Sequence, residues 1–309
     1  MKNNFLIKAC VKVKREIFED RINRIICKKC RIRKDDLIMA SFPKSGRTWV
    51  RFFMAEYINQ IYNLDYKLNW DNFVYLSPSP LCNKRDGLRN LPNIDKRFIL
   101  SHDKRIGRFF KNRKVIFITR NFFDIIISYY FFHKNRDKKD FEKLEINDFA
   151  KNIFNMKEAV NRINYFSKQL PKSNSYFIIP YENLKVEYEK IFPEIINFSF
   201  FPYDQKKIKT AINFSSFNNM RKLEKEKLKE EKQENFHTRE GKSFKYKNYL
   251  TEETISYIKN YLEKNLKGIL RKYYLIDHND KICGKYEIKK YNLTLRYHLL
   301  IQCELIYPL

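Results

Sequence analysis

The chain has 309 residues, enough to bury one large core, and its 43% hydrophobic and 16% aromatic residues exclude a wholly disordered or fibrous protein. No stretch approaches the ~18 consecutive apolar residues of a membrane span, and no secretory signal is evident after the first residues. The six cysteines form no dense framework, so we expect a reducing, cytoplasmic setting.

The charge balance is strongly basic, with 63 Lys and Arg against 36 Asp and Glu and a net charge of +27. Such a charge attracts anions, including nucleotides, nucleic acid, anionic lipid and acidic glycans. The abundance of Phe and Tyr beside only six glycines is also what codon drift in an A/T-rich genome produces. The charge alone therefore leaves the class of partner open.

Residues 1–35 are expected to be a basic N-terminal extension, a candidate for peripheral contact with an anionic membrane. This segment contains Cys27 and Cys30 in a CxxC pair. Because no second pair lies nearby, we interpret them as two incidental cysteines rather than a metal site.

From residue 36 the pattern predicts an α/β domain. Short apolar runs predict strands over 36–41, 97–101, 114–119 and 175–180, and apolar residues at three- and four-residue steps predict a helix over 48–62. The apolar segment 123–132 is either a buried helix or a long strand. Strands alternating with helices favour a mainly parallel central sheet flanked by helices on both faces.

The C-terminal part is less regular. Residues 221–235 are almost wholly charged, which indicates a solvated helix or a loop. A last helix is predicted over 252–271, and 275–309 form a C-terminal extension of uncertain structure. The central domain is accordingly placed at 36–274.

The segment Phe42–Trp49, FPKSGRTW, lies between a predicted strand and a predicted helix. A βα turn of this kind presents backbone N–H groups and the positive end of a helix dipole to an anion. Gly46 lets the backbone approach the anion, Lys44 adds a positive charge, and Ser45 and Thr48 add hydroxyl donors. The turn is therefore a candidate phosphate site.

The residue order separates this turn from a nucleoside-triphosphate loop, which reads GxxxxGK[ST], because Lys44 precedes the only glycine. The strand over 114–119 ends in Arg120, where a metal-dependent NTPase of that type needs a nearby Asp. Arg120 attracts a second phosphate, and Ser128 can face it if the next segment is helical. These features favour a nucleotide whose transferable group needs no metal.

Taken together, the motifs resemble those of cytosolic-type sulfotransferases that use 3′-phosphoadenosine 5′-phosphosulfate (PAPS). PKSGRTW resembles the family's 5′-phosphosulfate loop, and RNFFDIIISYY at 120–130 resembles its 3′-phosphate motif. Three further segments match in order: IPYENL at 179–184, SSFNNM at 215–220, and 239–251. The resemblance covers about 36–274 and implies a P-loop-containing fold and sulfonyl transfer to a hydroxyl or amine.

The resemblance also implies roles for individual residues. Trp49 and Phe217 would lie on the two adenine faces, and Arg120 with Ser128 would hold the 3′-phosphate. His102, in a segment similar to the family's KTH, would be the catalytic base, and Lys44 would neutralise the leaving phosphate. No metal is expected. The donor-binding set is Lys44, Ser45, Gly46, Arg47, Thr48, Trp49, Arg120, Ser128, Tyr181, Ser216, Phe217, Arg239 and Gly241.

Two departures from the family pattern affect the expected activity. Leu100 stands where the family has a lysine, so either Lys104 or Arg105 substitutes for it or the rate is low. Glu240 replaces another lysine and places an anion near the proposed 3′-phosphate site.

Two other functions remain open at this point. One is a P-loop kinase that uses Mg²⁺ and ATP, which the Lys-before-Gly order disfavours. The other is a non-catalytic nucleic-acid or membrane-surface binding protein on a degenerate scaffold, which Leu100 and Glu240 favour; no specific nucleic acid is expected. The variable loops 63–96 and 133–170 are polar and cationic, which favours a glycan or glycolipid acceptor over a flat phenol.

Overall fold

The computed structural model describes residues 32–79, 94–136, 141, 143–227, 246–275 and 287–290. The first 31 residues of the predicted N-terminal extension, with Cys27 and Cys30, lie outside these ranges. So do Arg239, Glu240 and Gly241. The expectations placed on those residues therefore stay predictions.

A parallel sheet forms the centre of the molecule, as the sequence predicts. Its strands are β1 (Leu37–Ser41), β2 (Phe98–Ser101), β3 (Lys114–Thr119) and β4 (Ser175–Pro180), and they lie in the order β2-β1-β3-β4. A fifth strand, β5 (Glu287–Lys290), pairs antiparallel with β4. This strand was not predicted, because it lies in the segment whose pattern gave no clear element.

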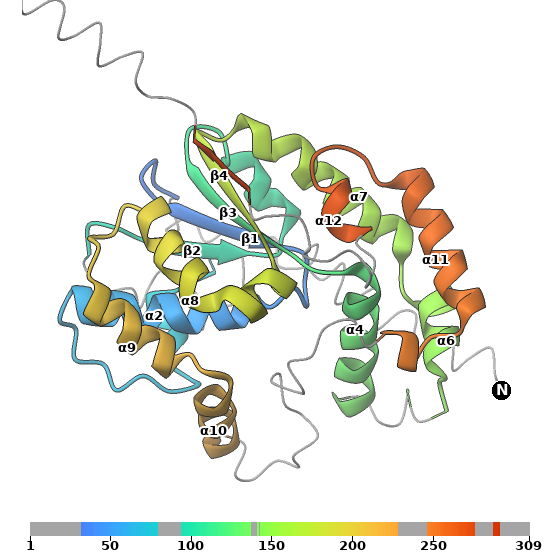
Figure 1. Cartoon of the computed structure of the whole chain (residues 1–309), viewed down its shortest axis with the longest axis horizontal. Helices are drawn as coiled ribbons and strands as arrows, with labels where there is room; N and C mark the ends of the chain where they lie inside the picture. The colour runs from blue at the N-terminus through green and yellow to red at the C-terminus, as the bar shows by residue number, and fades with distance from the viewer. Residues whose placement is uncertain are drawn as a thin grey trace, which may run out of the picture.

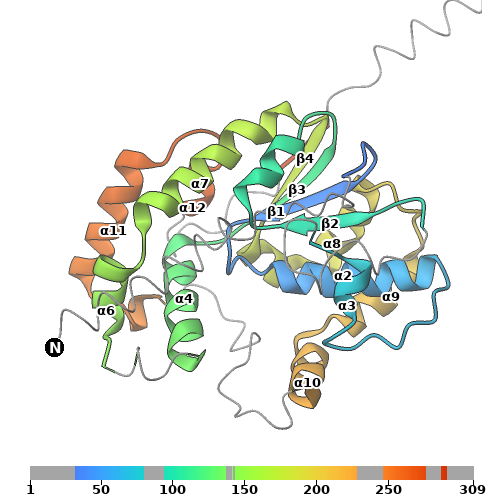
Figure 2. The same cartoon turned by 180° about the vertical axis from the view of Figure 1, so that it is seen from behind.

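Helices cover both faces of the sheet (Figures 1 and 2). The described helices, with three short 3₁₀ segments and one π segment, have the following bounds: α2 (Arg47–Ile61), α3 (Phe73–Leu76), α4 (Phe122–Arg136), α6 (Ile146–Asp148), the π segment Phe149–Ile153, α7 (Met156–Gln169), α8 (Tyr181–Phe198), α9 (Gln205–Phe214), α10 (Phe217–Lys227), α11 (Glu252–Asn265) and α12 (Arg271–Tyr274), with 3₁₀ segments at Lys104–Phe109, Leu170–Lys172 and Tyr246–Asn248. The segment 123–132 is therefore helical.

Alternation along the strands divides the core between the two faces. Leu37 and Met39 of β1 pack with side chains of α2, α3, α8 and α9. Ile38 and Ala40 point to the other face and pack with α4, α7, α11 and α12. Both faces of such a strand are buried, so its sequence is a continuous apolar run. This is why the parallel strands could be predicted.

The predicted last helix, over 252–271, is shorter in the structure. It ends at Asn265, and a separate helix, α12, begins at Arg271. Between them Gly268 has a φ of 74°, and a Cβ at this position would lie 2.5 Å from Ser167 Oγ. The close approach to α7 therefore turns the chain where the apolar spacing alone suggested one continuous helix.

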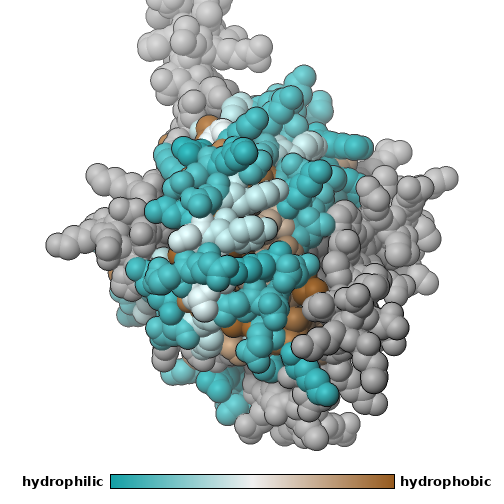
Figure 3. All heavy atoms as spheres, turned by 90° about the vertical axis from the view of Figure 1, so that its right-hand side faces the viewer, coloured by the Kyte–Doolittle hydropathy of each residue, from teal (hydrophilic) through white to brown (hydrophobic). Residues whose placement is uncertain are grey.

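Helix α11 buries one stripe and exposes the rest. Its buried residues Thr254, Ile258 and Leu262 are spaced four apart and face the core. The side of the molecule that carries α11 is largely hydrophilic (Figure 3). Within the described ranges, every helix is too short or too polar to cross a bilayer.

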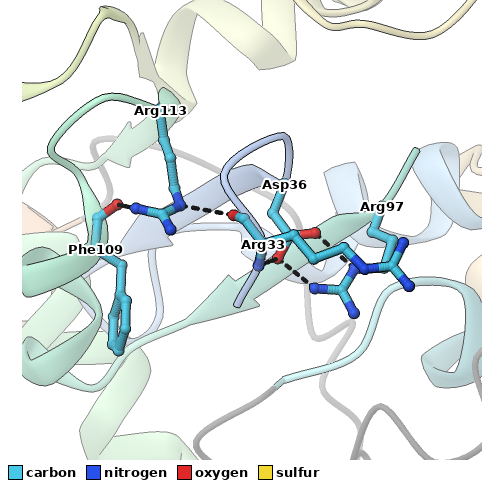
Figure 4. Close-up of polar contacts among 5 residues, drawn as sticks. All are labelled: Arg33, Asp36, Arg97, Phe109 and Arg113. Carbon is cyan, nitrogen blue, oxygen red and sulfur yellow. Dashed lines mark hydrogen bonds and ion pairs between the residues drawn. The ribbon is translucent and has the colours of Figure 1, made fainter. Parts of the chain in front are cut away.

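A buried ion pair joins the amino ends of β1 and β2 (Figure 4). Arg97 donates hydrogen bonds of 2.6 Å from Nε and Nη2 to the two carboxylate oxygens of Asp36. The backbone N–H of Arg33 donates to the same carboxylate, and Arg113 Nε donates to the Arg33 carbonyl at 2.8 Å. The cluster fixes the chain entering β1 at the end of the sheet opposite to the candidate site.

Replacing Asp36 with alanine removes the carboxylate that the Arg97 guanidinium contacts, while Arg97 is only 7% exposed. Breaking a buried ion pair on one side costs about 3 kcal/mol, so the free energy of unfolding should fall by about that amount in urea titrations. Glu253→Gln is the matched control, because Glu253 is 83% exposed in its pair with Lys151. Its effect should stay within about 0.5 kcal/mol. Equal effects of the two substitutions would contradict the account.

Candidate active site

Strand register brings the predicted site residues to one edge of the sheet. Ala40 is paired with Ser101, Ser41 with Ile118, and Thr119 with Pro180. The residues that follow these pairs, including the loop after Ser41, therefore emerge side by side at the carboxyl ends of the strands. Helices α2 and α4 begin at this same edge (Figure 2). Such an edge is where parallel α/β sheets bind ligands.

The turn between β1 and α2 is tightly built around Gly46. This residue precedes α2 with a φ of 86°, in the left-handed region that favours glycine. A Cβ at Gly46 would lie 2.1 Å from Cδ2 of Tyr181, so the ring of Tyr181 lies directly against the turn. Both conformation and space require glycine here.

Two buried hydroxyl groups at this edge have no hydrogen-bond partner among the described residues. They are Ser45 Oγ in the turn and Thr119 Oγ1 at the end of β3. Both residues are fully buried. Leaving a buried donor unsatisfied costs about 1–3 kcal/mol, and a phosphate oxygen in the turn would satisfy Ser45. The turn therefore fits an anionic ligand.

Arg120 and Lys44 contact each other across this edge. Arg120 Nη1 donates a 2.9 Å hydrogen bond to the Lys44 carbonyl, and its guanidinium lies 4.7 Å from the centroid of the Tyr181 ring. Lys44 Nζ lies 3.3 Å from the centroid of the Phe132 ring on α4. Ser128 is one helical turn before Phe132, so it lies on the same face of α4 as Phe132. The face of α4 that meets the turn therefore includes Ser128.

Glu182, which sequence reasoning did not single out, supports this arrangement. Its Oε1 accepts a 2.9 Å hydrogen bond from the backbone N–H of Asn121, the residue after Arg120. Burial raises the pKa of Glu182 to about 7, although the Asn121 hydrogen bond and the charge of Arg120 act in the opposite direction. The signal that could have revealed it is its place directly after Tyr181 at a strand end.

Glu182→Gln should change how stability depends on pH. Because the folded pKa is about 7 and the ordinary value is 4.5, the unfolded chain releases the proton first as pH rises between these values. The carboxyl group thus lowers the free energy of unfolding over this range, by roughly 3 kcal/mol at about 1.4 kcal/mol per pH unit. Glutamine accepts the same backbone hydrogen bond without titrating. Denaturant titrations should find the variant more stable than wild type at pH 8 but not at pH 4.5; a pH-independent difference would contradict this.

His102 follows β2 and is held by the neighbouring strand. Its Nδ1 lies 3.2 Å from the Ser41 carbonyl oxygen and 3.1 Å from Ser41 Oγ. A carbonyl only accepts, so this contact assigns the proton to Nδ1 and leaves the lone pair on Nε2. The imidazole is thereby fixed in the tautomer that a base acting through Nε2 requires.

The surroundings of His102 keep it neutral. Burial lowers the pKa of His102 well below its ordinary value of 6.5, and the positive charges of Arg47, Arg162 and Lys44 lower it further. Arg162, a buried residue of α7, also donates a 3.2 Å hydrogen bond from Nη1 to the His102 carbonyl. A neutral imidazole close to cations can accept a proton beside an anionic ligand.

Of three further residues predicted to bind the donor, Trp49 and Ser216 contact other parts of the protein and Phe217 is partly exposed. Trp49 packs against Tyr188 and Phe192 of α8, with ring centroids 5.8 and 5.6 Å away. Phe217, the first residue of α10, is 37% exposed, as a ring that stacks on a ligand requires. Ser216 Oγ accepts from the backbone N–H of Asn219 at 3.4 Å and so caps α10. Their proposed contacts with adenine stay predictions.

Neither expected substitute for the missing lysine is directed to this role. Lys104 is 55% exposed and its Nζ lies 3.8 Å from Glu158. Arg105 forms an ion pair with the buried Asp103, which caps the 3₁₀ segment that Arg105 enters. Leu100 is fully buried in the apolar core on the α2 side of the sheet. The cations that act on His102 are instead Arg47, Arg162 and Lys44. Arg162 was not predicted from the sequence, because it lies 60 residues away from His102 in the chain.

The comparisons with known proteins agree with this fold and identify a family. A family model described as "Sulfotransferase domain" matches residues 34–269. Sulfotransferase 6B1 of Gorilla gorilla gorilla is 30% identical over 200 residues, which cover 61% of this chain and 63% of that protein. The chain thus spans less than two thirds of that relative. Flavonol 3-sulfotransferase of Flaveria bidentis is 25% identical over 75% of this chain and 82% of its own length.

Solved structures show the same fold. A mouse sulfotransferase in complex with PAP (3′-phosphoadenosine 5′-phosphate) has a TM-score of 0.52 and 16% identity to this chain. The match covers 75% of this chain and 84% of the mouse chain. A retinol dehydratase in complex with androsterone and inactive cofactor PAP has a TM-score of 0.54 and 15% identity, covering 79% and 86%. The α/β fold with a parallel sheet flanked by helices, predicted from the sequence, is confirmed.

Proposed function

The chain belongs to the sulfotransferase-domain family, and from that premise we propose that it transfers a sulfonyl group from PAPS to an acceptor hydroxyl or amine. The observation that carries the proposal is the meeting, at one sheet edge, of the Lys44–Gly46 turn, Arg120 and a neutral His102. An anion site alone would suit many nucleotides. An anion site with a base of fixed tautomer beside it suits transfer of a group to a hydroxyl or amine, which must lose its proton during the reaction.

The donor side uses fixed cations and hydroxyl groups. Lys44, Ser45 and Thr48 would bind the 5′-phosphosulfate, with the Ser45 hydroxyl gaining the acceptor that it lacks within the described residues. Arg120 and Ser128 would bind the 3′-phosphate through a planar guanidinium and a hydroxyl. Tyr181, Trp49 and Phe217 would contact the adenine, with Arg239 and Gly241 completing the phosphate site.

On the acceptor side, His102 Nε2 removes the proton from the acceptor. The acceptor oxygen or nitrogen forms its bond to sulfur while the bond from sulfur to the bridging phosphate oxygen breaks, and 3′-phosphoadenosine 5′-phosphate (PAP) leaves with the electron pair. Lys44 stabilises the charge that develops on this leaving oxygen. His102 then returns its proton to solvent.

The family and the site favour this function over the two rivals. A P-loop kinase would require the lysine after the second glycine of its loop, and Lys44 comes before Gly46. A purely nucleic-acid-binding role leaves the position and tautomer of His102 unexplained. A relative named cytosolic sulfotransferase 7, from Arabidopsis thaliana, supports a cytoplasmic location. Contact of residues 1–35 with an anionic membrane is a further proposal.

The acceptor class that the sequence favours is a glycan or glycolipid. The experiment incubates the purified protein with PAPS and, separately, 4-nitrophenol, a methyl hexoside, a uronic-acid oligosaccharide and a glycolipid. Mass spectrometry looks for the mass gain of one SO₃ group, with PAP release measured in parallel. Transfer to the sugars supports a carbohydrate acceptor, and transfer to 4-nitrophenol alone contradicts it. PAP release that no acceptor in the set increases would argue against sulfonyl transfer to hydroxyl groups of these classes.

A further inference from the structure

The first two residues of α8, Tyr181 and Glu182, contact both turns that are proposed to bind phosphate. The ring of Tyr181 lies against the turn between β1 and α2, and the Arg120 guanidinium lies 4.7 Å from the centroid of the same ring. Glu182 Oε1 accepts a 2.9 Å hydrogen bond from the backbone N–H of Asn121, in the turn between β3 and α4. The start of α8 therefore connects the two turns.

Asn121 is the residue from which α4 begins. Its Oδ1 accepts a 3.2 Å hydrogen bond from the backbone N–H of Asp124, and its carbonyl oxygen accepts one of 3.1 Å from the N–H of Ile125. These two contacts cap the helix. The N–H of Asn121 belongs to the peptide bond that joins it to Arg120. By accepting from this N–H, Glu182 fixes the backbone from which the Arg120 side chain extends.

The carboxyl group of Glu182 lies in a place that suits its neutral form. Glu182 is 5% exposed, and its second oxygen, Oε2, has no hydrogen-bond partner in the part of the chain that the structure describes. An ionised carboxylate accepts on both oxygens, and burying one without donors is costly. A neutral carboxyl group keeps its carbonyl oxygen as the acceptor for Asn121. Burial accordingly raises the pKa of Glu182 to about 7.

The charged and titratable groups that act on Glu182 come from several elements. Arg120, after β3, acts on it with a positive charge, and Asp124, a buried residue of α4, acts with a negative charge. Tyr274 of α12 is fully buried, and its pKa is raised first by burial and then by the charge of Glu182. The charge of Glu182 acts in the same direction on the pKa of the neighbouring Tyr181. A phosphate bound to Arg120 would offset the positive charge and so favour the neutral form of Glu182.

We propose that Glu182 is a positioning residue of the 3′-phosphate site, which fixes the Arg120–Asn121 peptide and takes up one proton from solvent when the phosphate binds. This inference rests on the proposed function, which places the 3′-phosphate at Arg120. The hydrogen bond from Asn121 persists in both forms, because a carboxyl group still accepts through its carbonyl oxygen. The proton removes the negative charge that would repel the phosphate, and it returns to solvent when PAP leaves.

The test compares two ligands at two pH values. Calorimetry measures the affinities of PAP and of adenosine 5′-phosphate, which lacks the 3′-phosphate, for wild type, Glu182→Gln, Glu182→Leu and the control Glu189→Gln. Glu189 is an exposed residue of the same helix. Glutamine keeps the acceptor for Asn121 and carries no charge. At pH 8 we therefore expect Glu182→Gln to bind PAP roughly fivefold more tightly than wild type, and at pH 5.5 to bind it equally.

Two other comparisons separate this role from a structural one. Glu182→Leu removes the acceptor, so its PAP affinity should fall about tenfold or more at both pH values. Glu189→Gln should match wild type throughout. For adenosine 5′-phosphate, the ratio between Glu182→Gln and wild type should stay within about twofold at either pH. Calorimetry at pH 7.5 in two buffers of different ionisation enthalpy should show wild type taking up about half a proton more with PAP than Glu182→Gln does.

A ratio between Glu182→Gln and wild type that does not change with pH would overturn the inference. So would a change that is equal for PAP and adenosine 5′-phosphate, since the 3′-phosphate would then have no part in it. If Glu182→Leu does not fold, the Glu182→Gln comparison decides alone. If wild type binds neither ligand, the proposed function fails and this inference fails with it, whereas a pH-independent ratio with wild-type binding intact overturns this inference alone.

Discussion

Replacing His102 with alanine should lower kcat by roughly 10³-fold while the affinity for PAP stays within about threefold of wild type. The imidazole is the base in the proposed reaction, and its Nδ1 contact with the Ser41 carbonyl leaves Nε2 to accept the proton. PAP carries no reacting hydroxyl group, so its binding does not use the base. The rate of PAP release in the presence of an acceptor that the wild-type protein sulfonates gives kcat. Calorimetry with PAP gives the affinity for the same protein.

Two further variants sharpen this test. Ser41→Ala removes only the hydroxyl group near Nδ1 and retains the carbonyl, so turnover should fall by less than about tenfold. His102→Asn can keep a hydrogen bond to that carbonyl but has no basic nitrogen, and it should be as inactive as His102→Ala. A His102→Asn variant with wild-type turnover would show that His102 positions the strand end rather than accepting a proton.

The second large effect is expected for Arg120→Ala, which should raise the dissociation constant of PAP by on the order of 10³-fold. Arg120 would contribute two or more charge-assisted hydrogen bonds to the 3′-phosphate, each worth roughly 1.5–3 kcal/mol. Its Nη1 also donates to the Lys44 carbonyl, and its guanidinium lies over the Tyr181 ring, so its loss should also loosen the turn that is proposed to bind the 5′-phosphosulfate.

The control for Arg120→Ala is specific to the phosphate that it would bind. Adenosine 5′-phosphate lacks the 3′-phosphate, so its weaker binding should change by less than about tenfold in the variant. Thermal unfolding checks that the fold persists, because Arg120 is only half-buried. Equal losses of affinity for both ligands would place Arg120 elsewhere than at the 3′-phosphate.

The main elements were predictable because their physical causes are local. Four strands buried on both faces read as short apolar runs, and the Gly46 turn carries its residue types within eight positions. In a parallel sheet the carboxyl ends of the strands lie along one edge. His102, Arg120 and Tyr181 each directly follow a predicted strand, so their placement at this edge could be predicted as well. Local patterns of this kind identify both the sheet and the residues that emerge from its carboxyl edge.

The features that could not be predicted depend on contacts between distant segments. Arg162 reaches His102 from the middle of α7, where nothing in the local pattern distinguishes it from other arginines. Arg105 is one of the two residues expected to substitute for the missing lysine, but its ion pair with Asp103 directs it away. Gly268 interrupts the last helix because of Ser167 on another element. Sequence spacing specifies neither the partner of a charged side chain nor the packing that ends a helix.

The central claim is that this sheet edge binds the PAPS nucleotide without a metal ion. The most direct test titrates the purified full chain with PAP by calorimetry in the absence of Mg²⁺, with ATP and adenosine 5′-phosphate as comparison ligands. The account predicts a PAP dissociation constant on the order of micromolar, tighter than that of either comparison ligand. Tighter binding of ATP or a requirement for Mg²⁺ would contradict the account and favour the kinase. No binding of PAP would also contradict it and would favour the non-catalytic binding protein.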